Sequence, residues 1–222
     1  MKTLTTHRIA IALLVCSAII LAATPHCFAA PNGNTLSDSL NASRIQINKA
    51  AMFTLGGWSL GNMAINGTLL ALQSNVPSEN RPPSYYFQQM NIFWNVVNLG
   101  LAAGGLYGAF TENPQGISLF ETINQQTSIE RILLFNAGLD LAYIAAGAWM
   151  LERSKNTSDN ANLWQGYGQS LILQGAFLLL FDIGVYAIHH STADPLLREI
   201  LRAASIGIRQ GSGLELGFTL RL

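Results

Sequence analysis

The sequence predicts an all-α protein: a four-helix transmembrane bundle, followed by a C-terminal amphipathic helix and a short extended tail. Two observations lead to this prediction. Half of the 222 residues are hydrophobic and only 11% are charged, against roughly 25% charged residues in an average soluble domain. Four apolar stretches also recur along the chain, each about 20 residues or longer, which is enough to cross about 30 Å of hydrocarbon.

The N-terminus has the order of a secretory signal peptide. Its basic n-region is followed by a short apolar run at residues 9–23. Small residues at Cys27 and Ala29 suit the two positions that signal peptidase reads. We therefore predict that residues 1–29 are a signal peptide cleaved after Ala29, the alternative being an uncleaved anchor helix. Cleavage there would remove both cysteines of the chain, which excludes disulfides and thiolate sites from the mature protein.

Four membrane spans are predicted, at residues 50–73, 89–110, 132–151 and 170–189. The connections between them are polar and contain turn residues, such as Pro82 and Pro83. In the second connection, residues 118–130 are expected to form a polar helix outside the bilayer. Residues 30–190 are thus predicted to be one membrane domain.

The predicted location is a bacterial inner membrane. A cleaved signal peptide places the mature N-terminus in the periplasm, and four spans return the C-terminus to the same side. The aromatic residues agree with alternating spans, because one set falls on a single side as an interfacial belt: Tyr85, Tyr86, Trp149, Trp164 and Tyr167. The four arginines of the tail oppose this orientation, but the first segment usually dominates it.

Residues 191–222 are predicted to be the amphipathic helix and tail. Asp194 and Pro195 suit the N-cap and the first position of a helix, and the apolar residues between 196 and 208 share one helical face. After residues 211–213, apolar and polar residues alternate as in a strand. This strand could add to the sheet edge of a partner protein, and a frayed tail is the alternative.

Polar residues within the predicted spans form one narrow stripe on each span. They lie three, four, seven or eight residues apart, which places them on one helical face. Lipid cannot satisfy these groups, so the stripes should converge on the bundle interior. The candidate polar interior consists of Asn62, Asn66, Asn91, Asn95, Asn98, Asn136, Asp140, Gln174 and Asp182.

Asp140 and Asp182 are the two formal charges within the predicted spans. An ionised Asp at the bilayer centre costs about 2.5–3.5 kcal/mol on insertion scales, and no Lys or Arg lies at matching depth. The carboxyls are therefore protonated, hydrogen-bonded to asparagines, or reached by water. Four interpretations stay open: a structural interior or accessory membrane protein, a proton or water pathway, a pocket for a small ligand such as a lipid or quinone, and an intramembrane enzyme.

Glycines at intervals of four predict where helix backbones approach closely. Gly57 and Gly61 lie in the first span, and Gly100, Gly104 and Gly108 lie in the second. Small residues at this spacing allow two helices to pack without intervening side chains. We therefore expect close helix contacts at these five positions.

Known catalytic and cofactor motifs are missing from the sequence. It has no phosphate-binding glycine loop and no nucleophile elbow, and its net charge of zero gives no basic footprint for nucleic acid. His189 lies seven residues after Asp182 and is a weak candidate ligand, but two ligands are too few for a zinc site. We expect no catalytic residues, no metal and no cofactor, with the lipid bilayer and a protein bound through the tail as partners.

Three segments carry a resemblance to a known family. They read YFQQMNIFWNVVNLG at residues 86–100, RILLFNAGLD at residues 131–140 running on to ERSKN at residues 152–156, and YGQSLILQG at residues 167–175 with Asp182. Together they resemble an uncharacterised family of small four-helix membrane proteins, mostly from Bacteroidota. The resemblance covers residues 44–190. It implies that the Asn/Asp stripe is a family feature, and it brings no assigned activity.

Overall fold

The computed structural model describes residues 36–210 and 214–220 of the chain. In these ranges it has four long helices: α2 (Leu36–Ala71), α3 (Pro83–Thr111), α4 (Leu119–Lys155) and α5 (Ala161–Ala203). The short 3-10 helix η1 (Ser78–Asn80) lies between α2 and α3, and the strands β1 (Ala204–Gln210) and β2 (Leu214–Leu220) follow α5. The predicted all-α, four-helix fold class is confirmed. The predicted signal peptide lies outside the described residues.

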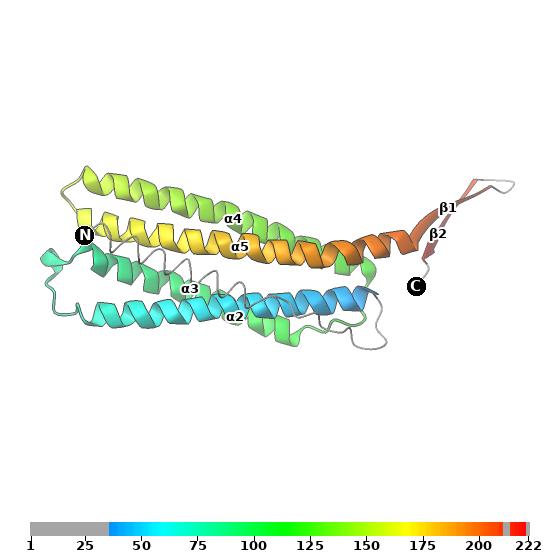
Figure 1. Ribbon diagram of the computed structural model, residues 1–222, viewed down its shortest axis with the longest axis horizontal. Coiled ribbons are helices and arrows are strands. Elements are labelled where there is room, and N and C mark those ends of the chain that lie inside the picture. Colours follow the sequence, from blue (N-terminus) through cyan, green and yellow to red (C-terminus); the bar gives the residue numbers. More distant parts are fainter. Residues whose placement is uncertain (1–35, 211–213, 221–222) are drawn as a thin grey trace.

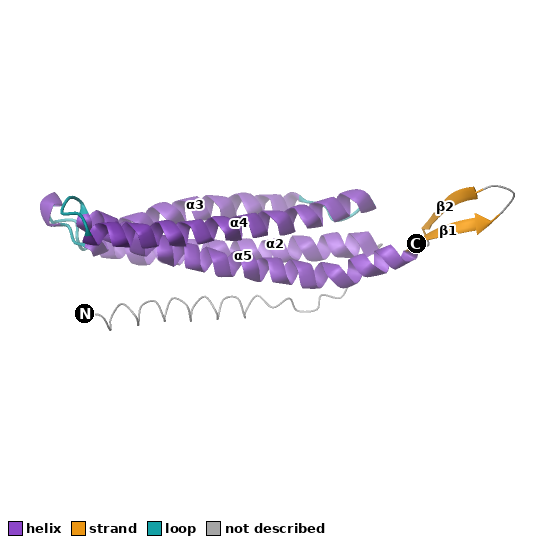
Figure 2. Ribbon diagram, turned by 90° about the horizontal axis from the view of Figure 1, so that it is seen from above, coloured by secondary structure: helices purple, strands orange, loops and turns teal. Residues whose placement is uncertain are grey.

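The four helices run side by side along the long axis of the molecule and alternate in direction (Figures 1 and 2). The α2–α3 and α4–α5 connections lie at one end, which we call the loop end. The start of α2, the α3–α4 connection and the end of α5 lie at the other, the tail end. α4 packs along α5, α2 packs along α3, and α5 also contacts α3, whereas α3 and α4 scarcely touch.

Local chemistry explains where the helices begin. Pro83 occupies the first position of α3, where the N–H that proline lacks would have no intrahelical partner. Ser118 caps α4, since its side-chain oxygen accepts a hydrogen bond from the backbone N–H of Glu121 at 3.2 Å. The connection before it turns at Gly116, whose φ of +75° favours glycine.

The helices are longer than the spans predicted from apolar runs. The polar stretch predicted to be helical at residues 118–130 is helical from Leu119 onward, and it forms the first part of α4. The prediction of a new helix starting at Asp194 is wrong. α5 runs through Pro195 and ends at Ala203. A proline can therefore look like a helix start in the sequence while lying within a longer helix.

The tail also differs from the prediction that residues 196–208 form one helix. Ala204–Gln210 is a strand, and it pairs with β2 in an antiparallel register that sets Ala204 opposite Leu220. The alternating segment after residue 213 thus finds its partner within the chain. An antiparallel ladder satisfies backbone groups of both segments, which explains why the helix stops before residue 208.

The bundle is apolar outside and largely polar inside. Large hydrophobic side chains are exposed on all four helices, including Phe53, Phe93, Phe135 and Ile183. Among the described residues, about as many polar as hydrophobic side chains are buried. Soluble proteins show the opposite distribution, whereas a bundle in lipid must keep its polar groups away from the hydrocarbon.

Three described helices are long and apolar enough to cross a membrane: Pro83–Thr111, Leu119–Lys155 and Ala161–Arg198. The span predicted at residues 50–73 lies in α2, which does not reach the same mean hydropathy. Glycine, asparagine, serine and threonine dilute its apolar residues. Composition therefore supports three of the four predicted spans. Whether the remaining one, at residues 50–73, crosses a membrane depends on how α2 packs against the other helices.

The close contact between α4 and α5 depends on glycines that the spacing argument did not select. A Cβ at Gly147 would lie 2.7 Å from the backbone oxygen of Gly168, and a Cβ at Gly175 would lie 2.9 Å from that of Asp140. The expectation of close contacts at the five other glycines is wrong. A Cβ would meet nothing within 4 Å at Gly57, Gly61, Gly100, Gly104 or Gly108. A spacing of four defines a helix face, but not which face meets a neighbour.

Replacing Gly147 by alanine should destabilise the protein by about 1–3 kcal/mol, because the added methyl group overlaps the α5 backbone. Gly138 on the same helix provides the matched control, since a Cβ there would meet nothing within 4 Å. Gly138→Ala should be neutral or stabilising by up to about 1 kcal/mol. Thermal unfolding of the detergent-solubilised variants measures both, and equal midpoints would contradict the proposed helix contact.

Candidate functional site

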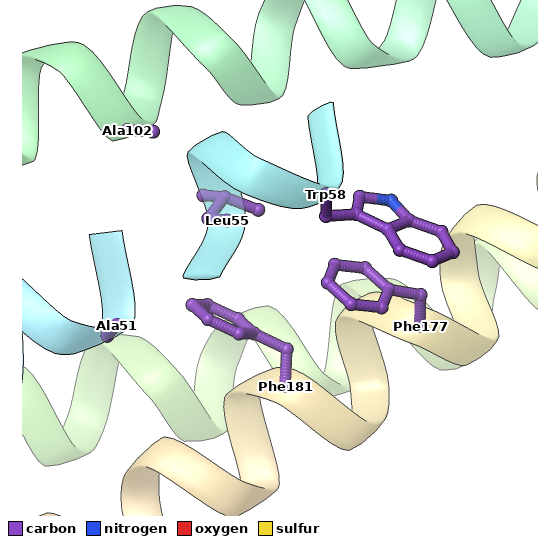
Figure 3. Close-up of a cluster of buried hydrophobic side chains, with 6 residues drawn as sticks. All are labelled: Ala51, Leu55, Trp58, Ala102, Phe177 and Phe181. Atoms are coloured by element: carbon purple, nitrogen blue, oxygen red, sulfur yellow. The ribbon is translucent and has the colours of Figure 1, made fainter. Parts of the chain in front are cut away.

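An aromatic cluster forms the centre of the bundle. The rings of Trp58 and Phe177 are stacked with centroids 3.9 Å apart, and Phe181 stacks on Phe177 at 6.0 Å. Figure 3 shows these three rings together with Ala51 and Leu55, which bring α2 against α5. This cluster fixes the α2–α5 contact and supplies an apolar wall to the space beside it.

A chain of side-chain hydrogen bonds joins α2, α5 and α3. The indole Nε1 of Trp58 donates to Oε1 of Gln174 at 3.2 Å. Gln174 Nε2 in turn donates to Oδ1 of Asn91 at 2.7 Å, and the hydroxyl of Ser170 donates to the same oxygen at 3.1 Å. Gln174, Asn91 and Ser170 are fully buried. They therefore act as a polar cross-link of the kind that holds membrane helices together.

Three other predicted asparagines bond within their own helix. Asn62 donates to the backbone oxygen of Trp58 and Asn66 to that of Asn62, at 3.0 and 2.9 Å. Asn95 donates to the backbone oxygen of Asn91 at 2.7 Å. These three amides donate to the backbone of their own helix, so they do not take part in the cross-link between helices.

A cavity of about 500 Å³ lies next to the aromatic cluster and is lined by all four helices. Its exposed lining residues belong to the two helices that scarcely touch, Val97 and Leu101 on α3 and Ile132 and Leu139 on α4. The cavity therefore opens sideways between α3 and α4, at the apolar outer surface of the bundle. Ligand sites commonly have volumes of about 300–1,000 Å³.

The base of this cavity is polar and acidic. Four of the predicted polar residues line it: Asn98, Asn136, Asp140 and Asp182. Asp140 on α4 and Asp182 on α5 face the same cavity from neighbouring helices. Two ionised carboxylates in one such site of low dielectric would repel strongly, so we expect the pair to retain a proton.

Several buried polar atoms at the cavity have no hydrogen-bond partner among the described residues. They are Trp94 Nε1, Asn98 Nδ2 and Asp140 Oδ2. Asn98 is only 2% exposed and Asp140 only 3%. A buried polar group without a partner costs about 1–3 kcal/mol. These atoms therefore mark where a polar group of a bound molecule would be stabilised.

Two aromatic residues close the cavity toward the loop end. The rings of Trp94 on α3 and Tyr143 on α4 have centroids 4.9 Å apart, and both line the cavity. Neither residue is among the predicted site residues. Their position in the middle of apolar spans was the available signal, because Trp and Tyr in membrane helices concentrate at the interfaces instead.

A second polar network lies at the tail end, where most side chains pair with one another, although Arg44 Nε and His189 Nδ1 have no partner among the described residues. Arg44 forms a salt bridge with Glu112 and donates to Oδ1 of Asn41 at 3.3 Å. Asn41 in turn donates to the hydroxyl of Thr122 at 3.0 Å. Asn41 and Arg44 lie before the first predicted span, which begins at residue 50. The polar stripe predicted within the spans therefore does not include this network.

His189 belongs to this tail-end network. It is buried, and its Nε2 lies 3.0 Å from Oδ1 of Asn48, so Nε2 carries the proton and donates. In the part of the chain that the structure describes, no group of three or more His, Cys, Asp or Glu residues could hold a metal ion. The contact of His189 with Asn48 links α5 to α2.

One comparison with known proteins gives a match. A model of a family of unknown function, DUF6992, matches residues 54–183. Neither the curated proteins nor the solved structures contain a match to the chain. The matched range includes the aromatic cluster, the cross-link and most of the cavity, and excludes the tail.

The two kinds of buried asparagine should respond differently to substitution. Asn91→Leu leaves Gln174 and Ser170 without their acceptor, so we expect a loss of about 1–3 kcal/mol. Asn98→Leu, seven residues later on the same helix, removes an amide nitrogen that has no partner, so its stability should be unchanged or higher. Thermal unfolding in detergent measures this difference. An equal loss at both positions would mean that Asn98 also holds the bundle together.

Proposed function

Because the chain belongs to the DUF6992 family of unknown function, we propose its role from the site alone: it is a membrane protein that binds a small amphiphilic molecule in the cavity between α3 and α4. The observation that carries this proposal is the cavity's base. Asn98 and Asp140 each present a buried polar atom without a partner there, and Trp94 presents another at the edge of the cavity, while the mouth is apolar.

The shape of the cavity matches an amphiphile. Its apolar lining, from Val97 and Leu101 to Ile132 and Leu139, would contact the hydrocarbon part of a ligand. The unpaired groups would contact its polar end. A molecule of this kind concentrates in the bilayer, and the mouth between α3 and α4 faces the surroundings from which it would enter.

Membrane placement of all four helices is part of this proposal. α2 packs antiparallel to α3 and also contacts α5. If α3 and α5 cross the membrane, α2 therefore crosses it beside them. Its outer face is apolar, with Phe53, Leu60 and Ile65 each more than half exposed. The location we propose is a bacterial inner membrane, with the mature N-terminus in the periplasm.

The accessory-protein alternative has one supporting feature. β1 and β2 form an isolated two-stranded ribbon that projects beyond the tail end of the bundle (Figure 1). The backbone edges of such a ribbon can pair with a strand of another protein. This role is compatible with ligand binding, since the ribbon lies apart from the cavity.

Val97→Phe should weaken ligand binding, because the larger ring narrows the mouth. Its neighbour Val96 is the matched control, since it is 53% exposed against 43% for Val97 and does not line the cavity. The probe is 11-bromoundecan-1-ol, whose bromine quenches an indole on contact. Each variant is also measured with Trp94→Phe added. The part of the quenching that this second substitution removes comes from Trp94 and therefore reports on the cavity alone.

We expect Val97→Phe to weaken binding by about fivefold or more, as overpacking by about 1 kcal/mol implies, and Val96→Phe to leave it unchanged. If Trp94 is not quenched in the unsubstituted protein, the cavity does not bind amphiphiles and the polar interior is structural. Equal effects of the two substitutions would place the probe on the outer surface.

The proposed orientation predicts where reporters are active. Alkaline phosphatase fused after residue 222 should be active, because this enzyme folds only in the oxidising periplasm. The same enzyme inserted in the α4–α5 connection, at residues 156–160, should be inactive. The reverse pattern would invert the orientation, and activity at both sites would contradict the single span, α5, that separates them.

A further inference from the structure

We propose that the molecule bound in this cavity is a lipophilic organic cation, an amine or quaternary ammonium with an apolar body, and that it displaces a proton from Asp140 and Asp182. This inference rests on the proposed ligand-binding function and adds the chemical class of the ligand. The observations that favour a cation are the charge of the cavity, the acceptors at its base and the rings at its edge.

The cavity is acidic and has no basic residue in its described lining. Asp140 on α4 and Asp182 on α5 are its carboxyls, and Tyr143 on α4 is its other titratable group. α2 and α3 contribute uncharged polar groups, Asn48 and Asn98. The closest basic groups of the tail-end network are already engaged, since Arg44 pairs with Glu112 and His189 donates to Asn48. A ligand must therefore bring any positive charge with it.

The cavity has two carboxyls and no basic residue in its described lining, and this excess of acidic groups decides which ligand charge is favoured. An anion would add a further negative charge next to two carboxyls in a site of low dielectric, which is strongly unfavourable. A neutral molecule would leave the carboxyl pair without a counter-charge. A cation gives the pair the partner that the protein itself does not supply, and paired charges are the form in which buried charge is tolerated.

Uncharged groups at the cavity also suit a cation. Asn98 lines the cavity and is 2% exposed, so its amide oxygen can accept from an ammonium group, while its unpaired nitrogen gains no partner from a cation. Trp94 and Tyr143 place two aromatic rings at the cavity edge. The face of an indole or phenol attracts ammonium groups electrostatically.

The exchange balances in charge and in protons. Without ligand, the carboxyl pair holds a proton between its two members. When one monovalent cation enters, one proton leaves the pair for water, so the site and its ligand together keep the same net charge. No electrons move and no covalent bond other than the O–H bond is broken. Binding of the cation should consequently compete with protons.

The test compares three amphiphiles that share a ten-carbon chain: decyltrimethylammonium, decan-1-ol and decanoate. Their binding to the purified full-length protein is measured by the Trp94-dependent competition with 11-bromoundecan-1-ol, with empty micelles as the blank. We expect decyltrimethylammonium to bind at least about tenfold more tightly than decan-1-ol, and decanoate to bind most weakly. A pH indicator in weakly buffered solution should report about one proton released for each cation bound.

Asp140→Asn and Asp182→Asn keep the size of the side chains and remove one carboxyl each. Each should lower the affinity for decyltrimethylammonium by about tenfold or more and leave that for decan-1-ol within about twofold. Asp159→Asn, an exposed acid in the α4–α5 connection, is the matched control and should change neither affinity. Retained decan-1-ol binding also shows that a variant is folded.

The outcomes separate the two proposals. If decan-1-ol and decyltrimethylammonium bind equally, or if the cation binds without releasing a proton, the inference of cation exchange is wrong while the amphiphile site stands. If none of the three compounds competes with the brominated probe and the probe itself does not quench Trp94, both proposals fail. Equal cation affinity in Asp140→Asn and Asp159→Asn would likewise overturn the role of the carboxyl pair.

Discussion

Polar side chains enclosed by an apolar exterior can pair only with one another, and the rest of this structure depends on that constraint. Gln174 meets it by accepting from Trp58 and donating to Asn91. These bonds tie α2, α5 and α3 together at one level of the bundle. The stacking of Trp58 on Phe177 follows from the same contact, so polar pairing and aromatic packing position the central helices jointly.

Several buried polar atoms do not meet this constraint, and we place the function where three of them surround a cavity. Gly147, Gly168 and Gly175 hold α4 close to α5, while α3 packs on α2 and α5. The contact between α3 and α4 is consequently slight, and a cavity opens between them. Polar atoms of Asn98 and Asp140 remain without partners at its base, where a bound molecule could satisfy them.

The two polar regions of the bundle thus have different roles. At the tail end, Arg44, Glu112, Asn41 and Thr122 form a paired network that joins the start of α2 to α4 and the α3–α4 connection. The cavity instead combines an acidic pair with unpaired amide and indole groups. Side chains that pair mainly with one another stabilise a structure, whereas a few polar groups around an accessible, largely apolar space are typical of a binding site.

The sequence by itself determined the helical class, the approximate positions of the helices and the polar stripe, because hydrophobicity and the 3.6-residue period are local properties. It also identified Asn98, Asp140 and Asp182. Only the tertiary structure decided which stripe residues meet. Asn62 and Asn66 have the same spacing as Asn136 and Asp140, yet the first pair bonds within its helix and the second lines the cavity. Helix rotation and packing distance, set here by glycines whose neighbours are far away in the chain, cannot be read from spacing within one helix.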